Sequence, residues 1–224
     1  MVEPVFVKIC GITSVDDATA ATDAGADAIG LNFVATSRRH VDRDTARAIV
    51  ASLPAHVMAV GIFEGHSVEQ VLDITGSLEL DAAQLHGEDP PEFTAAAAAG
   101  VPRVILALSV QSPMLEQLDE HAADVVMLDA PTPGGGVPFD WALVGDLVSR
   151  HRILLAGGLR PGNVAEAIRR VRPWGVDVAS GVEVRPIPDG PALKDPVLMA
   201  RFVTEARSAL PHPRDLADGL SDRR

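Results

Sequence analysis

Short β-branched apolar runs alternate with Ala-rich segments of helical length eight times along almost the whole chain. The runs that predict strands span residues 5–10, 26–33, 57–63, 81–85, 103–108, 124–129, 153–156 and 176–180. Strands this apolar, separated by helices rather than by hairpin turns, are typical of a parallel sheet that is buried on both faces. The eight repeats predict an α/β protein with a (β/α)8 TIM barrel, folded as a single domain over residues 1–210.

Capping signals mark where several of the predicted helices begin. Ser14 opens a Ser-Val-Asp-Asp sequence, which is the pattern of a capping box, and Asp42 and Ser67 are placed to cap the next two helices. An open doubly wound sheet is the alternative fold. That fold normally carries a Gly-rich dinucleotide-binding turn after its first strand, and residues 10–13 form no such turn.

Composition and charge narrow the classes of function. The net charge of -12, with six Phe, two Trp and no Tyr, argues against a nucleic-acid partner, which normally needs a basic surface and stacking side chains. No apolar stretch approaches the roughly 20 residues that cross a bilayer, and no signal segment is evident. A single cysteine cannot form an internal disulfide, so we expect a cytoplasmic protein with no membrane role. Residues 211–224 are polar, contain Pro and Gly, and are expected to form a flexible tail.

The only cysteine, Cys10, lies where the first predicted strand ends. Strand alternation puts Lys8 and Cys10 on one face, opposite the aliphatic face that packs against helices, so both should point into the enclosed barrel. A free cysteine is more often a small buried hydrophobe than a reactive group. Its position therefore leaves a structural and a chemical role open.

Polar side chains gather at the carboxyl ends of the predicted strands, where barrels of this type carry their functional groups. Asp129 ends an apolar run. It has either a structural role, as a helix cap or salt-bridge partner, or the role of a general acid, which requires that burial raises its pKa. A Gly/Pro-rich segment at 131–138 follows it and is suited to fold over a substrate. Arg38 and Arg39 are either a solvated pair or an anion site, and His86 is either structural or a substrate contact.

Two glycine turns follow the seventh and eighth predicted strands. Gly157 and Gly158 precede a helix, and Ser180 and Gly181 follow the last strand, so bare backbone amides can surround a phosphate. A glycine pair more often only turns the chain. These two loops, however, are the frequent phosphate site of such barrels, and two turns in these positions favour phosphate binding.

A series of short motifs runs in order through nearly the whole chain. They are KICGI (8–12), GLNF (30–33), SRR (37–39), QLHG (84–87), LD (128–129), FDW (139–141), AGGL (156–159), GVDV (175–178), GVE (181–183) and KD (194–195). Each motif is weak alone, but together they resemble the phosphoribosylanthranilate isomerase family of tryptophan biosynthesis.

The resemblance implies an Amadori rearrangement of N-(5-phosphoribosyl)anthranilate to 1-(2-carboxyphenylamino)-1-deoxyribulose 5-phosphate, with no metal and no organic cofactor. It implies that Asp129 is the general acid on the ribose ring oxygen and that Cys10 is the general base that takes the C2 proton. An unperturbed thiol is only a few per cent ionised at pH 7, so a nearby positive charge such as Lys8 is expected to favour the thiolate.

The resemblance also implies substrate contacts. Arg39 matches the arginine that meets the anthranilate carboxylate, and Lys8, His86 and Asp177 are expected to contact the substrate. The expected partner is therefore a small phosphorylated molecule, bound by a monomer or a homodimer.

Three departures from the family pattern affect the lid and the phosphate cradle. Residues 133–138 read PGGGVP where the family has Gly-Gly-Thr-Gly, Ala179 replaces a serine, and the segment between Glu183 and Lys194 is longer and Pro-rich. These changes bear on affinity and substrate range more than on reaction type.

Two rival functions stay open. One is a barrel isomerase that acts on another phosphoribosylamine; such enzymes typically use two aspartates, and Cys10 argues against it. The other is a non-catalytic sugar-phosphate-binding homologue, which the altered glycine segment favours and which the presence of both Cys10 and Asp129 disfavours.

Overall fold

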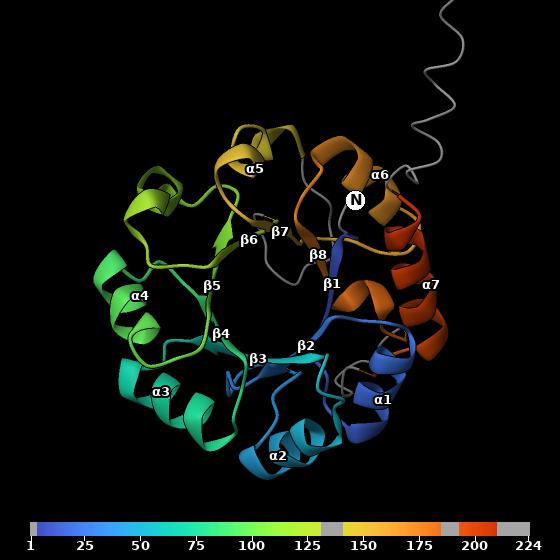
Figure 1. Cartoon of the computed structure of the whole chain (residues 1–224), viewed down its shortest axis with the longest axis horizontal. Coiled ribbons are helices and arrows are strands. Elements are labelled where there is room, and N and C mark those ends of the chain that lie inside the picture. The colour runs from blue at the N-terminus through green and yellow to red at the C-terminus, as the bar shows by residue number, and fades with distance from the viewer. Residues whose placement is uncertain (1–3, 131–140, 185–192, 210–224) are drawn as a thin grey trace, which may run out of the picture.

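A computed structural model describes residues 4–130, 141–184 and 193–209, with the backbone alone at 142 and 143. Eight parallel strands form a closed barrel in which each strand pairs with the next and β8 pairs with β1 (Figure 1). The strands are β1 (Phe6–Cys10), β2 (Ala28–Asn32), β3 (Met58–Glu64), β4 (Ala82–His86), β5 (Val104–Ser109), β6 (Val125–Asp129), β7 (Ile153–Leu155) and β8 (Gly175–Val178). The predicted barrel is confirmed, and every predicted strand is present. The expected tail at 211–224 and the Gly/Pro segment at 131–138 lie outside the described residues.

Helices form a ring around the barrel (Figure 1). The longer ones are α1 (Val15–Asp23), α2 (Arg43–Ser52), α3 (Val68–Ser77), α4 (Pro91–Ala98), α6 (Val164–Val171) and α7 (Pro196–Arg207). The predicted caps are present: Ser14, Asp42 and Ser67 each accept a hydrogen bond from a backbone N–H in the first turn of their helix. Among the described residues, no helix combines the length and the apolar character needed to cross a membrane.

The expected series of α-helices is interrupted in two places. Between β5 and β6 the chain forms a 3-10 helix, η1 (Pro113–Glu120), which breaks at Gln117 because 3-10 runs longer than a few residues are poorly hydrogen-bonded. Between β6 and β7 it forms a short 3-10 turn, η2 (Trp141–Val144), and a single turn of helix, α5 (Leu147–Arg150). A further 3-10 turn, η3 (Ser180–Val182), follows β8.

Strand alternation decides which side chains point into the barrel. In β1, Val7 and Ile9 belong to the aliphatic layer between sheet and helices, as predicted for this face. Inside the barrel, Phe6 stacks on Trp174 with ring centroids 4.5 Å apart and fills the amino-terminal end. Aliphatic side chains of other strands fill the middle of the interior, so the polar groups of the barrel are left at its carboxyl end.

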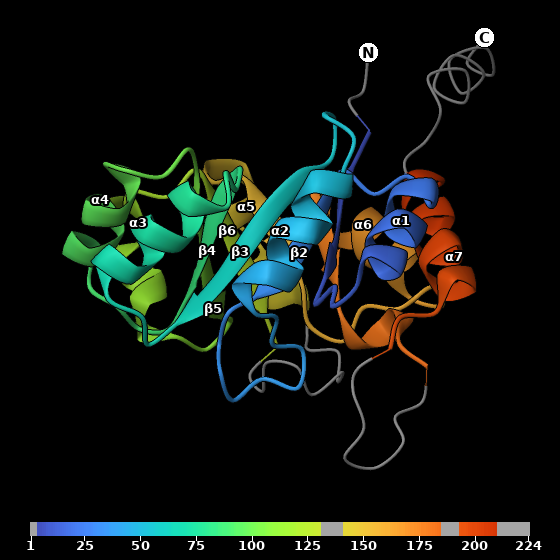
Figure 2. The ribbon, with the colours of Figure 1, turned by 90° about the horizontal axis from the view of Figure 1, so that it is seen from below.

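Aspartates fix the amino-terminal ends of alternate strands. Each lies just before an even-numbered strand and accepts the first free backbone N–H of the preceding strand. The pairs are Asp27 with Val7 (2.7 Å), Asp81 with Ala59 (2.8 Å) and Asp124 with Val104 (2.8 Å). The opposite end of the barrel carries the longer loops, and the 33–42 loop between β2 and α2 projects there in the side view (Figure 2).

Candidate active site

A buried ion pair lies inside the barrel towards the carboxyl ends of the strands. Lys8 Nζ is 2.8 Å from Asp177 Oδ1, so the pair joins the neighbouring strands β1 and β8, and Lys8 is completely buried. Burial alone would lower the pKa of Lys8, but the attraction of Asp177 and of Cys10 outweighs burial, and the pKa is raised. Lys8 therefore lies inside the barrel, as predicted, and it is a charged ammonium.

Cys10 ends β1 two residues beyond Lys8 and is partly exposed at the barrel mouth. Loss of hydration raises the pKa of the Cys10 thiol, and the charge of Lys8 opposes this rise without cancelling it. Asp177 adds to the rise. Lys8 thus favours the thiolate, as expected, but desolvation outweighs its effect and the thiol pKa is raised in the free protein.

Asp129 ends β6 and has the pKa of a usable acid. Burial raises the pKa of its carboxyl from 3.8 to about 6, although the Ala130 N–H, which donates to Oδ1 at 2.7 Å, works in the opposite direction. Gly157 lies directly against this carboxyl. A Cβ at Gly157 would be 3.0 Å from Asp129 Oδ1 and 2.5 Å from the Ala130 nitrogen, and its φ is +82°, so only glycine fits there.

His86 ends β4 as a neutral imidazole. Burial, together with the charge of Lys8, lowers the pKa of His86 to about 4. The amide of the fully buried Gln84 donates to His86 Nε2 at 2.5 Å. One ring nitrogen is thereby occupied, and Nδ1 is left as the nitrogen that can carry the proton and donate to a ligand.

Three basic side chains surround Glu183, which follows η3. Arg39 Nε is 2.7 Å from Glu183 Oε1, Lys194 Nζ is 3.1 Å from the same oxygen, and Arg38 pairs with Oε2. Both arginines bind this buried carboxylate, but the Arg38 side chain is 40% exposed and the Arg39 side chain only 13%, so Arg39 is the more enclosed of the two. Only 9% of Glu183 and 5% of Lys194 are exposed, so the cluster belongs to the interior of the rim.

Residues of both glycine turns, Gly157, Gly158 and Ser180, line a small cleft together with Asp129 and Asp177. Gly157 and Gly158 both have positive φ, and among the described residues their amides donate to no backbone carbonyl. Gly181 is a point of close approach, since a Cβ there would lie 1.9 Å from the Leu159 carbonyl oxygen. The loops after β7 and β8 therefore touch, and Gly157 and Gly158 line the cleft beside them.

A second cleft of about 190 Å³ adjoins the first and shares Asp129 with it. His86, Glu64, Ser109 and Ser112 are among its lining residues. The candidate acid thus lies between two clefts, one with glycine amides and one with polar side chains.

The comparisons with known proteins agree on one family. The family model described as N-(5'-phosphoribosyl)anthranilate (PRA) isomerase matches residues 7–205. The N-(5'-phosphoribosyl)anthranilate isomerase of Myxococcus xanthus is 44% identical over 213 residues, which are 91% of this chain and 97% of the relative. The chain belongs to the PRA isomerase family.

Solved structures of PRA isomerases share the fold. The enzyme from Thermus thermophilus matches with a TM-score of 0.83 and 34% identity, over 92% of this chain and 100% of that one. A PRA isomerase in complex with reduced 1-(o-carboxyphenylamino)-1-deoxyribulose 5-phosphate matches with a TM-score of 0.79 and 38% identity, over 90% and 98%. The resemblance read from the motifs is therefore confirmed.

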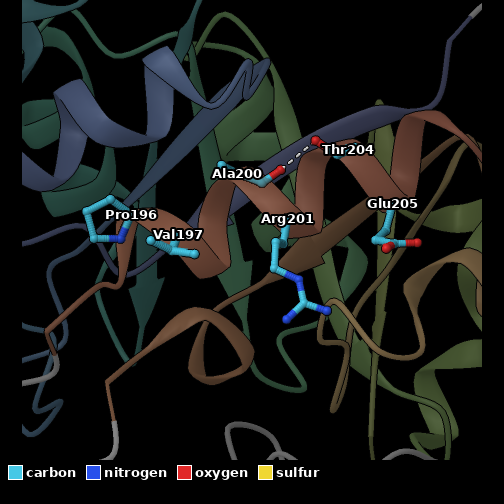
Figure 3. A pocket seen from close by; sticks show the side chains of 6 residues that line it. All are labelled: Pro196, Val197, Ala200, Arg201, Thr204 and Glu205. Atoms are coloured by element: carbon cyan, nitrogen blue, oxygen red, sulfur yellow. Dashed lines mark hydrogen bonds between the residues drawn. The ribbon is translucent and has the colours of Figure 1, made fainter.

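A larger hollow of about 430 Å³ lies elsewhere, on the outer face of the PRA isomerase barrel (Figure 3). It is lined by one helix alone, α7, through Pro196, Val197, Ala200, Arg201, Thr204 and Glu205. A single helix cannot enclose a small molecule, and Thr204 already donates to the Ala200 carbonyl within that helix. The rim of the barrel is the better site.

Sequence reasoning missed two groups of rim residues of this PRA isomerase. Glu64 and Ser109 end β3 and β5, but the predicted strands stop one residue earlier because a polar residue after an apolar run looks like the start of a loop. Continuing the alternation by one residue would have placed both at the mouth. Glu183 and Lys194 appeared only as parts of motifs, and no local pattern signals that they pair with each other.

Proposed function

We propose that this chain converts N-(5'-phosphoribosyl)anthranilate into 1-(o-carboxyphenylamino)-1-deoxyribulose 5-phosphate, as an aldose-ketose isomerase of tryptophan biosynthesis. Besides family membership, one observation carries the proposal. Asp129, with its pKa raised to about 6, and the Cys10 thiol end two strands of the same rim. A carboxyl poised near neutral pH and a thiol on one rim are the acid and base that the rearrangement requires.

The rearrangement proceeds by two proton transfers that these groups perform. Asp129 donates a proton to the ribose ring oxygen as the C1–O bond breaks, and the nitrogen lone pair forms the C1 iminium. The iminium acidifies the C2 hydrogen, and the Cys10 thiolate removes it to give an enolamine. Solvent accepts the enol proton and supplies the proton that C1 gains, which completes the ketone. Exchange with solvent then returns Asp129 to the acid and Cys10 to the thiolate, so the net reaction moves hydrogens without gaining or losing atoms.

The remaining rim groups hold the two ends of the substrate. We assign the phosphate to the backbone of Gly157, Gly158, Ser180 and Gly181, which is supported by the Gly157 and Gly158 amides, since these donate to no backbone carbonyl in the described part of the chain. We assign the anthranilate carboxylate to Arg39, which the chain needs because its net charge of -12 otherwise repels an anion. His86 is proposed to donate Nδ1–H to the sugar. The Lys8–Asp177 pair is proposed to contact the ribose hydroxyls.

The cellular setting follows from the chemistry of the proposed base. A catalytic thiol must stay reduced, which favours the cytoplasm. One relative, from Thermotoga maritima, is described as a dimeric enzyme. For this chain we propose a monomer or a homodimer built on one barrel domain of residues 1–210.

Rescue of a tryptophan auxotroph that lacks its isomerase tests the proposal directly. The wild-type gene should restore growth without tryptophan, and Cys10→Ala and Asp129→Asn should not. The purified protein should consume N-(5'-phosphoribosyl)anthranilate, while a phosphoribosylamine of the histidine pathway serves as the control. Failure of the wild-type protein in both assays would refute the proposed function.

A further inference from the structure

Among the described residues, the Glu183 carboxylate accepts hydrogen bonds from basic side chains alone. Oε1 accepts from Arg39 Nε at 2.7 Å and from Lys194 Nζ at 3.1 Å, and Oε2 accepts from Arg39 Nη2 at 3.2 Å and from Arg38 Nη2. Burial alone would raise the pKa of Glu183, but the hydrogen bond from Arg39 and the charge of Lys194 outweigh burial, and the pKa is lowered. Glu183 is therefore a fixed anion at the barrel mouth.

The contact with Glu183 uses one particular edge of the Arg39 guanidinium. Nε and Nη2 form the side edge of the group, and both donate to Glu183. Among the described residues, Arg39 Nη1 donates to nothing. A guanidinium has five N–H donors in a rigid plane, so the donors of the end edge, Nη1 and the second hydrogen of Nη2, have no partner among the described residues and suit a planar anion.

The stem of Arg39 is fixed as well as its head. A Cβ at Gly11 would lie only 2.2 Å from Arg39 Cδ, so the arginine stem runs directly over the Gly11 backbone. Gly11 follows Cys10 in the chain, and its φ of +74° also favours glycine. Arg39 is thus held between Gly11 and Glu183, beside the proposed catalytic base.

Glu183 is in turn held by the backbone and by Lys194. Glu183 and Lys194 form an isolated antiparallel bridge, flanked by hydrogen bonds from Val184 N to Leu193 O (3.0 Å) and from Asp195 N to Val182 O (2.9 Å). Lys194 Nζ also donates to the Ala179 carbonyl at 2.9 Å. A carboxylate fixed in this way can set the orientation of the group that it binds.

We propose that Glu183 is a positioning residue for substrate specificity: it occupies the side edge of Arg39 and thereby directs the end edge at the substrate carboxylate. Lys194 holds Glu183 in place. This inference rests on the proposed function, because it takes the aromatic carboxylate of the substrate as the ligand of Arg39. It predicts that Glu183 affects discrimination for that carboxylate, although Glu183 itself does not touch the ligand.

The test compares two ligands that differ in one group. These are reduced 1-(o-carboxyphenylamino)-1-deoxyribulose 5-phosphate and its phenylamino counterpart, which lacks the carboxylate. Calorimetry gives Kd for both with wild-type protein, Glu183→Gln, Glu183→Asp and Arg39→Ala, and with Glu183→Gln combined with Arg39→Ala. Asp27→Asn is the matched control, since it removes a partly buried carboxylate that pairs with Arg207 at 2.7 Å, at the amino-terminal end of the barrel.

Glu183→Gln should raise the Kd of the carboxylated ligand about 10-fold or more, which is the scale expected for a misplaced binding group. It should change the Kd of the phenylamino ligand by no more than about twofold. Glu183→Asp keeps the charge, so its Kd for the carboxylated ligand should lie between those of wild type and Glu183→Gln. In the Arg39→Ala background, Glu183→Gln should have no further effect, because its action passes through Arg39. Asp27→Asn should preserve the wild-type ratio of the two Kd values.

The proposal would be overturned if Glu183→Gln raised the Kd of both ligands equally, or if its effect on Kd added to that of Arg39→Ala. Either result would show a merely structural role. If Glu183→Gln does not fold, the same comparison with Glu183→Asp decides the matter. Failure of the proposed function looks different: the wild-type protein would then show no isomerase activity and no preference for the carboxylated ligand.

Discussion

Replacing Asp129 by Asn should stabilise the fold while it abolishes turnover. The carboxyl is partly buried at the end of β6, and desolvation raises its pKa from 3.8 to about 6. Asn resembles the protonated acid in shape, and its side-chain oxygen can still accept the Ala130 N–H that Asp129 Oδ1 accepts at 2.7 Å. The variant therefore removes a buried charge without removing a hydrogen bond.

The magnitude follows from the pKa difference between the folded and unfolded states. A folded-state pKa above the unfolded value means that the carboxyl contributes its full stability below about pH 4 and loses that contribution as the pH rises through about 6. One pH unit of pKa difference corresponds to about 1.4 kcal/mol, so ionisation of Asp129 destabilises the folded state by at most about 3 kcal/mol at pH 8.

Urea unfolding at pH 4 and pH 8 measures this effect. At pH 8, Asp129→Asn should have the higher free energy of unfolding, by at most about 3 kcal/mol, and at pH 4 the two proteins should be nearly equal. Asp124→Asn is the control at the other end of β6. There the carboxylate accepts the Val104 N–H at 2.8 Å, and the variant should gain nothing, because a neutral amide is the weaker acceptor. Equal stability of Asp129→Asn and wild type at pH 8, or a gain that persists at pH 4, would refute the reasoning.

Cys10→Ala should lower kcat by about 100-fold or more with ligand affinity largely kept, since a positioned base is worth at least that much; more than about a tenth of wild-type activity would contradict its role. The active form has Asp129 protonated and Cys10 ionised, so the two groups together carry one proton. They carry one proton at any pH between the pKa of Asp129, about 6, and the raised pKa of the thiol, so kcat/KM should rise to a plateau above about pH 6 and fall only above the thiol pKa. A profile that falls through pH 6 would contradict this. Arg39→Ala should cost roughly 2 to 4 kcal/mol of transition-state stabilisation, from kcat/KM, without changing inhibition by phosphate; a larger loss in Arg38→Ala would move the assignment to Arg38. Sulfate soaked into crystals should bind at the glycine loops after β7 and β8, and Gly181→Ala should abolish this binding, since a Cβ there meets the Leu159 carbonyl at 1.9 Å; sulfate seen only elsewhere would remove the phosphate assignment.

The sequence by itself determined the barrel, the family, and the strands at whose ends Cys10, His86 and Asp129 lie. These properties are local, because strand alternation, helix caps and short motifs are encoded by residues a few positions apart. The inward face of Lys8 and the position of Asp129 at a strand end could be predicted in this way. The same reasoning failed at the ends of β3 and β5, where a single polar residue belongs to the strand and looks like a loop.

Only the tertiary structure decided how the charges pair and which groups are protonated. Lys8 and Asp177 lie 169 positions apart, and Arg39 and Glu183 lie 144 apart, so each pair exists only because β8 closes the barrel against β1. Packing around the barrel mouth removes hydration from Cys10, Asp129 and His86 and shifts their pKa values, since desolvation depends on everything packed around a group. Neither the partner of a charge nor the hydration that it loses is encoded in its neighbours along the chain.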